Sequence, residues 1–383
     1  MKRVYLDNAA TTYPKPECVS QAVCDFIENI GSNVGRGSYQ NSYSAAQVVY
    51  ETRELLCNLF NFDNPLSTVF TMNITQSLNM LLKGFLKHGD HILVSSMEHN
   101  AVMRPLNSLK KSGIEFTKIP CDVFGQIDYD VVEGLIKPNT KMAVISHASN
   151  VCGTMQDIEK LGSIFKKYNI HFVLDSAQTA GVFDIDFKKA NLSALCFTGH
   201  KGLLGPQGIG GFIITNDFAS KITPLIEGGT GSLSESEEQP EYLPDKFEAG
   251  TLCLPAIYGL NASLKYIQNE TTEAIREKEL YLTKIFIDGV KNIGGIRLIG
   301  YEDIKNRAPV VSLSFEDIDN SEVAFLLDRD YGIMTRVGLH CAPSAHKTLN
   351  TFPKGTVRFS FGHMNTEEEV KYTLDAIYKI IGK

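Results

Sequence analysis

The sequence predicts an α/β protein, with a mostly parallel seven-stranded sheet between helices and a smaller C-terminal α/β unit. Between residues 68 and 215, short apolar runs alternate with amphipathic stretches. Some of these runs, such as Met142–Ile145 and Phe172–Leu174, are apolar throughout, which is typical of parallel strands covered by helices on both faces. The length of 383 residues is enough for one large unit and a smaller one.

The elements of the large unit follow in order along the chain. Strands are expected at Val69–Met72, Ile92–Met97, Phe116–Pro120, Lys141–His147, His171–Ala177, Ala194–Thr198 and Gly211–Thr215. Helices are expected from about Thr75, and at Ala101–Lys111, Tyr129–Ile136 and Ile158–Lys167. Residues 228–250, rich in glycine, serine and acidic residues, predict a long loop.

The C-terminal part repeats the alternation on a smaller scale. Helices are expected over 255–268, 272–290, 321–330 and 366–381, and strands near 296–300, 309–315, 333–336 and 356–360. We therefore expect a large domain over residues 15–255, and a second unit made of residues 1–14 together with 256–383.

Composition excludes several classes of protein. There are 37 Lys and Arg against 44 Asp and Glu, a formal charge of −7, which argues against a nucleic-acid binder. No apolar run approaches the ~18 residues of a membrane helix, and Asp7 interrupts the first apolar residues too early for a signal peptide. The eight cysteines form no C-x-x-C pair, which disfavours both disulfides and zinc. We expect a cytoplasmic protein that binds no membrane and no metal.

Polar side chains follow four of the predicted strands. His99, Asn150, Asp175 and Lys201 each lie at or just beyond the carboxyl end of one strand. In an open parallel sheet, ligands bind outside the carboxyl ends of the strands. Each residue also has a plainer explanation, because a lysine is usually a surface residue and an aspartate often caps a helix. The plainer explanations do not account for a shared position at one edge of the sheet, so we expect a single site there.

The residue types at this edge suit pyridoxal 5′-phosphate. A carboxylate such as Asp175 can pair with the pyridine nitrogen, and a lysine such as Lys201 can form a Schiff base with the aldehyde. An imidazole can stack on the flat ring. Thr75 stands where a helix opens directly after a strand, and free N–H groups at a helix N-terminus favour a phosphate.

At these residues the chain resembles the cysteine desulfurases and selenocysteine lyases of the class V aminotransferase type, which are pyridoxal-phosphate enzymes of fold type I. The resemblance extends over nearly the whole chain. It rests on Tyr5–Thr12, Arg36–Gly37, Glu98–Asn100, Ser149–Thr154, Asp175–Gln178, Thr198–Lys201, Phe247–Thr251 and Arg336–Ala342. It implies sulfur mobilisation from L-cysteine or L-selenocysteine, with a possible use in iron–sulfur cluster assembly.

The resemblance also implies a role for each cofactor residue. Lys201 would hold the cofactor covalently, Asp175 would pair with its pyridine nitrogen and His99 would stack on its ring. Two amides, Gln178 and Asn150, would reach the ring oxygen and the substrate. The phosphate would be held by Thr75, Gln76, Thr198 and His200, and by Thr251 from a second subunit. That last match implies a homodimer with composite active sites.

Substrate residues are implied in the same way. Arg358 matches the arginine that binds the substrate carboxylate, for which a bidentate side chain is suited, and Arg336 and Asn8 are lesser candidates for that region. Cys341, beside the imidazole of His340, would attack the substrate sulfur as a thiolate and carry it as a persulfide. A thiolate requires an electropositive, partly exposed setting. His99 would assist proton transfer. The short loop around Cys341 implies a dedicated sulfur-acceptor protein.

Two departures from the family pattern are visible: Tyr39 stands where many relatives have histidine, and Gln76 where glutamate is common. Several alternatives stay open on sequence grounds. One is an aminotransferase or lyase that does not use Cys341, and another is a noncatalytic sulfur-relay scaffold, against which Lys201 argues. A metal site built from Cys341 and the histidines at 340, 346 and 363 matches no standard zinc spacing.

Overall fold

A seven-stranded sheet forms the centre of the larger part of the computed structural model, which describes residues 3–34, 37 and 39–382. Its strand order is β2-β8-β7-β6-β5-β3-β4. Strand β8 runs antiparallel to both of its neighbours, and the remaining neighbours pair in parallel. The predicted sheet is therefore confirmed. The strands are β2 (Thr68–Thr71), β3 (His91–Ser95), β4 (Glu115–Ile119), β5 (Thr140–Ser146), β6 (His171–Asp175), β7 (Ala194–Thr198) and β8 (Gly210–Ile214).

Both faces of this sheet are apolar, because alternate side chains of each strand point to opposite sides. Phe172 and Leu174 pack into one hydrophobic cluster, and Val173 into another. The first cluster lies under α2 (Gln40–Leu59), α5 (Ile158–Lys167) and α7 (Leu254–Glu270). The second lies under α3 (Ile74–Phe85), α4 (Asn100–Leu109) and α6 (Asn216–Ala219). Helix α1 (Glu17–Asp25) packs against α7.

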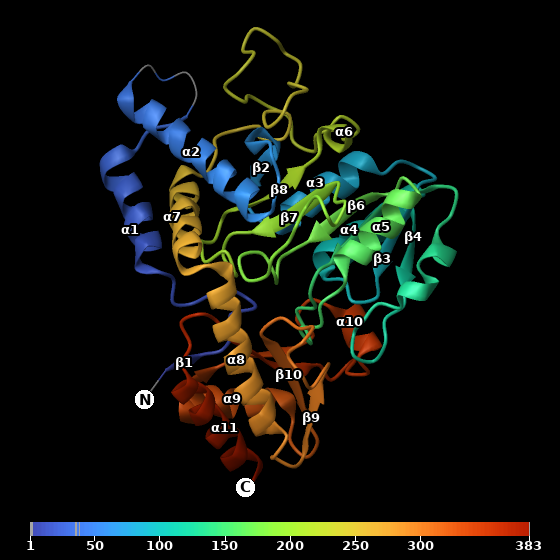
Figure 1. Cartoon of the computed structure of the whole chain (residues 1–383), viewed down its shortest axis with the longest axis vertical. Helices are drawn as coiled ribbons and strands as arrows, with labels where there is room; N and C mark the ends of the chain where they lie inside the picture. Colours follow the sequence, from blue (N-terminus) through green and yellow to red (C-terminus); the bar gives the residue numbers. More distant parts are fainter. Residues whose placement is uncertain (1–2, 35–36, 38, 383) are drawn as a thin grey trace.

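The C-terminal part is built on a four-stranded antiparallel sheet of order β12-β13-β10-β9. Figure 1 shows these elements in orange and red beyond the large sheet, with the N-terminus beside them. The N-terminus is held there because β1 (Val4–Tyr5) pairs with β11 (Ile333–Met334). The other elements are β9 (Ile296–Ile299), β10 (Val310–Phe315), β12 (Arg336–Gly338), β13 (Thr356–Ser360), α8 (Thr272–Val290), α9 (Asn320–Tyr331), α10 (Pro343–Thr348) and α11 (Glu367–Ile381).

Two local predictions are wrong. The helix expected at Tyr129–Ile136 is a pair of 3-10 turns, Tyr129–Val131 and Glu133–Leu135. Gly134 weakens the segment and Pro138 follows it closely, so there is no room for a stable α-helix. The strand expected at 333–336 is divided into β11 and β12, which belong to different sheets. No element was predicted for the stretch that forms α1 and α2.

The predicted loop over 228–250 contains no helix or strand, as expected. All eight cysteines are free thiols. Among the described residues, no group of three or more His, Cys, Asp or Glu side chains is placed to hold a metal ion. None of the described helices combines the length and apolar character needed to cross a bilayer.

Candidate active site

A cavity of about 310 Å³ lies at the carboxyl ends of the parallel strands. Strands β3, β5, β6 and β7 run in the same direction, so the residues that follow them meet at one edge of the sheet. The structure therefore brings most of the predicted site residues together around one cavity. The predicted site residues that line the cavity are Thr75, His99, Asn150, Asp175, Gln178, Thr198, His200, Lys201, Arg336, Cys341 and Arg358.

One end of the cavity is suited to a phosphate. Thr75 lies in the first turn of α3, where N–H groups have no acceptor within the helix and the helix dipole favours an anion. Thr198 Oγ1 and His200 Nδ1 are buried polar atoms without a hydrogen-bond partner. Leaving such atoms unpaired costs free energy, so they fit a ligand with acceptor oxygens. Burial, with a smaller contribution from Lys201, lowers the pKa of His200 to about 4.

The middle of the cavity is suited to a pyridinium ring. Asp175 ends β6 and accepts one hydrogen bond, 2.9 Å long, from the Ala177 N–H. Burial raises the pKa of Asp175, while the Ala177 N–H and Lys201 act in the opposite direction. A buried carboxylate needs a cationic or hydrogen-bonding partner, and a protonated ring nitrogen would provide one.

His99 caps the N-terminus of α4, and its Nδ1 accepts a hydrogen bond from the Ala101 N–H at 3.0 Å. Burial, reinforced by the charges of Lys201, Arg104 and Arg358, lowers the pKa of His99 to about 4. The imidazole is therefore neutral near pH 7. Because Nδ1 acts as an acceptor, the proton of the neutral ring lies on Nε2.

Lys201 follows β7 and lines the same cavity, and its backbone is fixed by the N-terminal segment. Thr12 Oγ1 donates to the Lys201 carbonyl at 2.8 Å, and Lys15 Nζ donates to the His200 carbonyl at 2.8 Å. Burial lowers the pKa of the Lys201 ammonium to about 8, although Asp175 acts to raise it. An amine with a lowered pKa is a better nucleophile near neutral pH.

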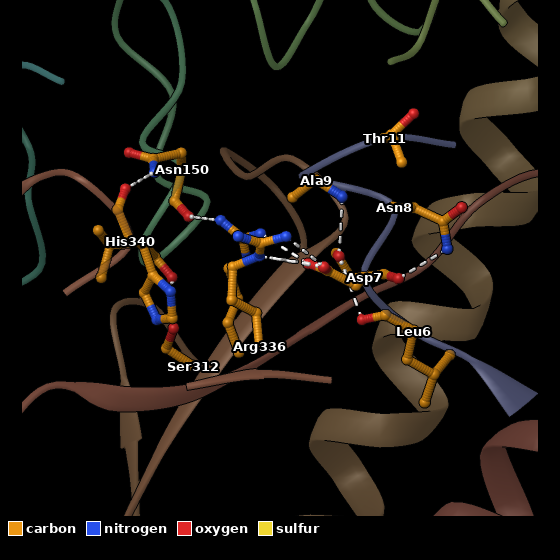
Figure 2. Close-up of polar contacts among 12 residues, drawn as sticks. Leu6, Asp7, Asn8, Ala9, Thr11, Asn150, Ser312, Arg336 and His340 are labelled. Atoms are coloured by element: carbon orange, nitrogen blue, oxygen red, sulfur yellow. Dashed lines mark hydrogen bonds and ion pairs between the residues drawn. The ribbon is translucent and has the colours of Figure 1, made fainter. Parts of the chain in front are cut away.

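The part of the cavity wall formed by β12 and β13 carries two arginines, and both are paired with Asp7. Arg358 is buried and its Nη2 lies 2.8 Å from Asp7 Oδ1. Arg336 Nη2 lies 2.9 Å from Asp7 Oδ2. Figure 2 shows Asp7 facing Arg336, with Asn150 and His340 beyond it. Burial lowers the pKa of Arg358, and the hydrogen bond to Asp7 raises the pKa of Arg336.

Cys341 lies on a sharp turn at the rim of the cavity. It is exposed, and both His340 (φ 47°) and Cys341 (φ 56°) have left-handed backbones. Two contacts hold the turn: the Asn100 N–H donates to the Cys341 carbonyl at 2.8 Å, and Asn150 Nδ2 donates to the His340 carbonyl at 2.7 Å. The partly exposed setting expected for a reactive thiol is therefore present.

The positive charge near this thiol does not come from its neighbour in sequence. Burial, together with the charges of Arg358 and Arg336, lowers the pKa of His340 to about 2, so its imidazole is neutral. Its Nε2 lies 3.0 Å from Thr356 Oγ1. Arg336 is a cation that lines the same cavity as Cys341 and interacts electrostatically with it. The electropositive setting expected for Cys341 is therefore not provided by His340.

Three predicted residues do not line the cavity. Gln76 is used locally, since its Oε1 accepts from the Met72 N–H at 2.8 Å. The amide of Asn8 is engaged inside the protein, because Nδ2 donates to the Ser360 carbonyl at 2.9 Å and to Asn365 Oδ1 at 3.1 Å. Asn8 instead borders a small neighbouring cavity that Gln178 and Lys201 also line. Thr251 is exposed and borders a separate hollow.

Sequence reasoning missed the role of Asp7, which was used only as the carboxylate that interrupts the first apolar residues and as part of the Tyr5–Thr12 motif. The sequence did contain an indication of this role, because a lone carboxylate in an apolar segment needs a partner when it is buried. Of the departures noted in the sequence, Tyr39 is an exposed residue at the start of α2. The nearby motif residue Arg36 lies outside the described residues.

Fold and site together define a fold type I enzyme of the class V aminotransferase type. The family model for aminotransferase class V matches residues 4–373, so the chain belongs to this family. Within it, the chain belongs with the cysteine desulfurases. A protein of Methanothermobacter thermautotrophicus named probable cysteine desulfurase is 32% identical over 383 residues, which covers 99% of this chain and 95% of that protein.

Solved structures show the same similarity. The apo cysteine desulfurase of Thermococcus onnurineus NA1 aligns with a TM-score of 0.93 and 32% identity, covering 99% of this chain and 95% of that one. The cysteine desulfurase CsdA of Escherichia coli, in an S-sulfonic acid form, aligns with a TM-score of 0.89 and 27% identity, again covering 99% and 95%.

Proposed function

We propose that this protein is a pyridoxal 5′-phosphate-dependent cysteine desulfurase, which converts L-cysteine to L-alanine and keeps the sulfur on Cys341 as a persulfide. The observation that carries the proposal is that one cavity is lined by Lys201, Asp175, Arg358 and Cys341. These side chains provide a Schiff-base amine, a partner for a pyridine nitrogen, a carboxylate-binding group and a sulfur nucleophile. An aminotransferase that leaves the thiol unused would not require a cysteine at this position.

The donor set fits pyridoxal phosphate. Lys201 would hold it covalently, Asp175 would pair with its pyridine nitrogen, and His99 would lie against its ring. The unpaired Thr198 Oγ1 and His200 Nδ1, with the N-terminus of α3 at Thr75, would receive its phosphate. When bound, the cofactor would act as an electron sink for the Cα of the amino acid.

The residues of the chain would then act in sequence. Arg358 would bind the substrate carboxylate, and the Lys201 amine, with its lowered pKa, would move the proton at Cα. The Cys341 thiolate would attack the substrate sulfur, so that an S–S bond forms as the Cβ–S bond breaks. The electron pair of the broken bond would stay on the carbon skeleton, which takes up a proton and leaves as alanine.

The position of Cys341 bears on how the sulfur leaves. Backbone contacts from Asn100 and Asn150 hold both residues of the Cys341 turn, so the persulfide cannot travel far. We therefore expect an acceptor protein that reaches the cavity rim, as a supplier of sulfur for iron–sulfur cluster assembly would require. The eight free thiols fit a reducing compartment such as the cytoplasm.

The proposal includes a homodimer in which Thr251 completes the phosphate site of the second subunit. Its support is that Thr251 is exposed and borders a separate hollow rather than its own cavity. Light scattering tests the stoichiometry. Mixing a Thr251→Val subunit with a Lys201→Ala subunit tests the composite site, because activity should return only in the mixed dimer that retains one intact site.

The experiment that tests the function is turnover of L-cysteine by the cofactor-loaded protein, with alanine release and the mass of the Cys341 peptide as readouts. Cys341→Ser should bind the cofactor normally but lose alanine release from L-cysteine by at least about 100-fold. Cys24→Ser, which changes another exposed thiol on α1, is the matched control and should keep full activity. Extra sulfur found only on other cysteines would contradict the proposal.

A further inference from the structure

Asp7 bridges two arginines that belong to different strands. Arg358 lies on β13 and Arg336 on β12, and the two residues are register partners in the antiparallel sheet. The Asp7 carboxylate accepts from Arg358 Nη2 at 2.8 Å, and from Arg336 Nε and Nη2 at 3.0 and 2.9 Å. Asp7 and Arg358 are both buried, so their charge pair is shielded from water, whereas the Arg336 side chain is 49% exposed.

The two arginines face the cavity, and the carboxylate lies behind them. Arg336 and Arg358 line the cavity, whereas Asp7 does not. Arg358 Nη1 donates to the Asn150 carbonyl at 3.0 Å, which leaves its buried Nε without a partner. Asp7 therefore cannot touch a bound amino acid directly, and it acts through the two guanidinium groups that it holds in place.

The charges at this end of the cavity can be counted. Two guanidinium groups and one carboxylate leave a net charge of +1. The neighbouring imidazoles of His99 and His340 add nothing near neutral pH. Lys201 and Asp175 would engage the cofactor, and they are the same in every variant compared below. One substrate carboxylate reduces the remaining charge to zero, and a second acidic group on the same substrate would be in excess.

We propose that Asp7 is the residue that determines charge specificity at the carboxylate end of the cavity. By neutralising one of the two arginines, Asp7 limits this end to a single negative charge, so that α-amino acids with an uncharged side chain bind and acidic ones are disfavoured. This inference rests on the proposed function, because it takes the ligand to be an α-amino acid.

L-Asparagine and L-aspartate are the appropriate probes, because they have nearly the same shape and differ by one negative charge. Binding of each to the cofactor-loaded protein is measured by titration calorimetry, which needs no turnover. The wild type should bind L-asparagine more tightly. Asp7→Asn leaves a net charge of +2, so the affinity for L-aspartate relative to L-asparagine should rise by about tenfold. This is the effect of one charge roughly 12 Å away at a dielectric constant of about 20.

Two further variants separate charge from structure. Asp7→Asn combined with Arg336→Gln returns the net charge to +1 and should restore the wild-type ratio, although it removes two native side chains. Arg336→Gln alone, with a net charge of zero, should move the ratio in the opposite direction, and this test remains if Asp7→Asn fails to fold. The same ratio in all four proteins would overturn this inference alone. Failure of the wild type to bind either amino acid would also overturn this inference, whereas absence of alanine release from L-cysteine would overturn the proposed function.

Discussion

Glu279 is a buried carboxyl group on α8 whose ionisation should destabilise the fold. Its side chain is 4% exposed. Burial raises its pKa from 4.5 to about 8, and the His363 N–H and Lys278 act in the opposite direction. Because the folded-state pKa is raised, the folded protein holds the proton more tightly than the unfolded chain. Stability is therefore unaffected below about pH 4.5 and is lost as the pH rises from there to about 8.

The size of the effect follows from the two pKa values. A difference of about 3.5, at about 1.4 kcal/mol per unit, sets an upper limit of about 5 kcal/mol above pH 8. Between pH 5 and pH 8 the loss from this group alone is about 3.5 kcal/mol. For a chain of 383 residues, that free energy corresponds to about 4 °C in melting temperature. Glu279→Gln keeps the shape of the protonated acid and should abolish this loss.

The assay is thermal unfolding of wild type and Glu279→Gln from pH 5 to pH 9, with the same cofactor loading throughout. The two proteins should melt close together at pH 5 and diverge in favour of the variant by pH 8. Glu277→Gln, an exposed position on the same helix, is the matched control and should follow the wild type. Parallel curves for wild type and Glu279→Gln would refute the reasoning, because they would mean that the carboxyl group ionises at the same pH in both states.

Two further predictions concern ligands of the cavity. Arg358→Lys should raise the KM for L-cysteine by about 10- to 100-fold, since a charge-assisted bidentate contact is lost. The control variant, Arg329→Lys on α9, should leave this KM unchanged. Equal effects of the two substitutions on KM would contradict the role of Arg358 in binding the substrate carboxylate. Thr198→Val should weaken binding of pyridoxal phosphate about tenfold, yet stabilise the cofactor-free protein by about 1 kcal/mol, because it removes an unpaired buried hydroxyl. Cofactor titration measures the binding of pyridoxal phosphate, and unfolding of the cofactor-free protein measures its stability. Weaker binding together with lower stability of the cofactor-free protein would contradict the view that the Thr198 hydroxyl is an unpaired phosphate ligand.

Much of the chemistry could be predicted from the sequence because it depends on local order. A strand that is apolar throughout must be buried, and the residue after its carboxyl end must lie at the ligand-binding edge. His99, Asp175 and Lys201 were found in this way, and the cavity lining confirms their positions. Gln76 could not be judged by the same reasoning, because its side chain accepts a hydrogen bond from the Met72 backbone and does not line the cavity.

The sequence by itself determined the parallel sheet, the edge at which the site lies and the residue types available there, since periodicity and strand ends are properties of short segments. Only the tertiary structure decided how charges pair over long separations. Asp7 meets Arg336 and Arg358 across 329 and 351 residues, and that pairing holds in place two guanidinium groups that line the same cavity as Cys341. Burial likewise sets the protonation of Glu279 and His340. The physical reason is that desolvation and Coulomb energies depend on distances in space, which no local pattern of residues specifies.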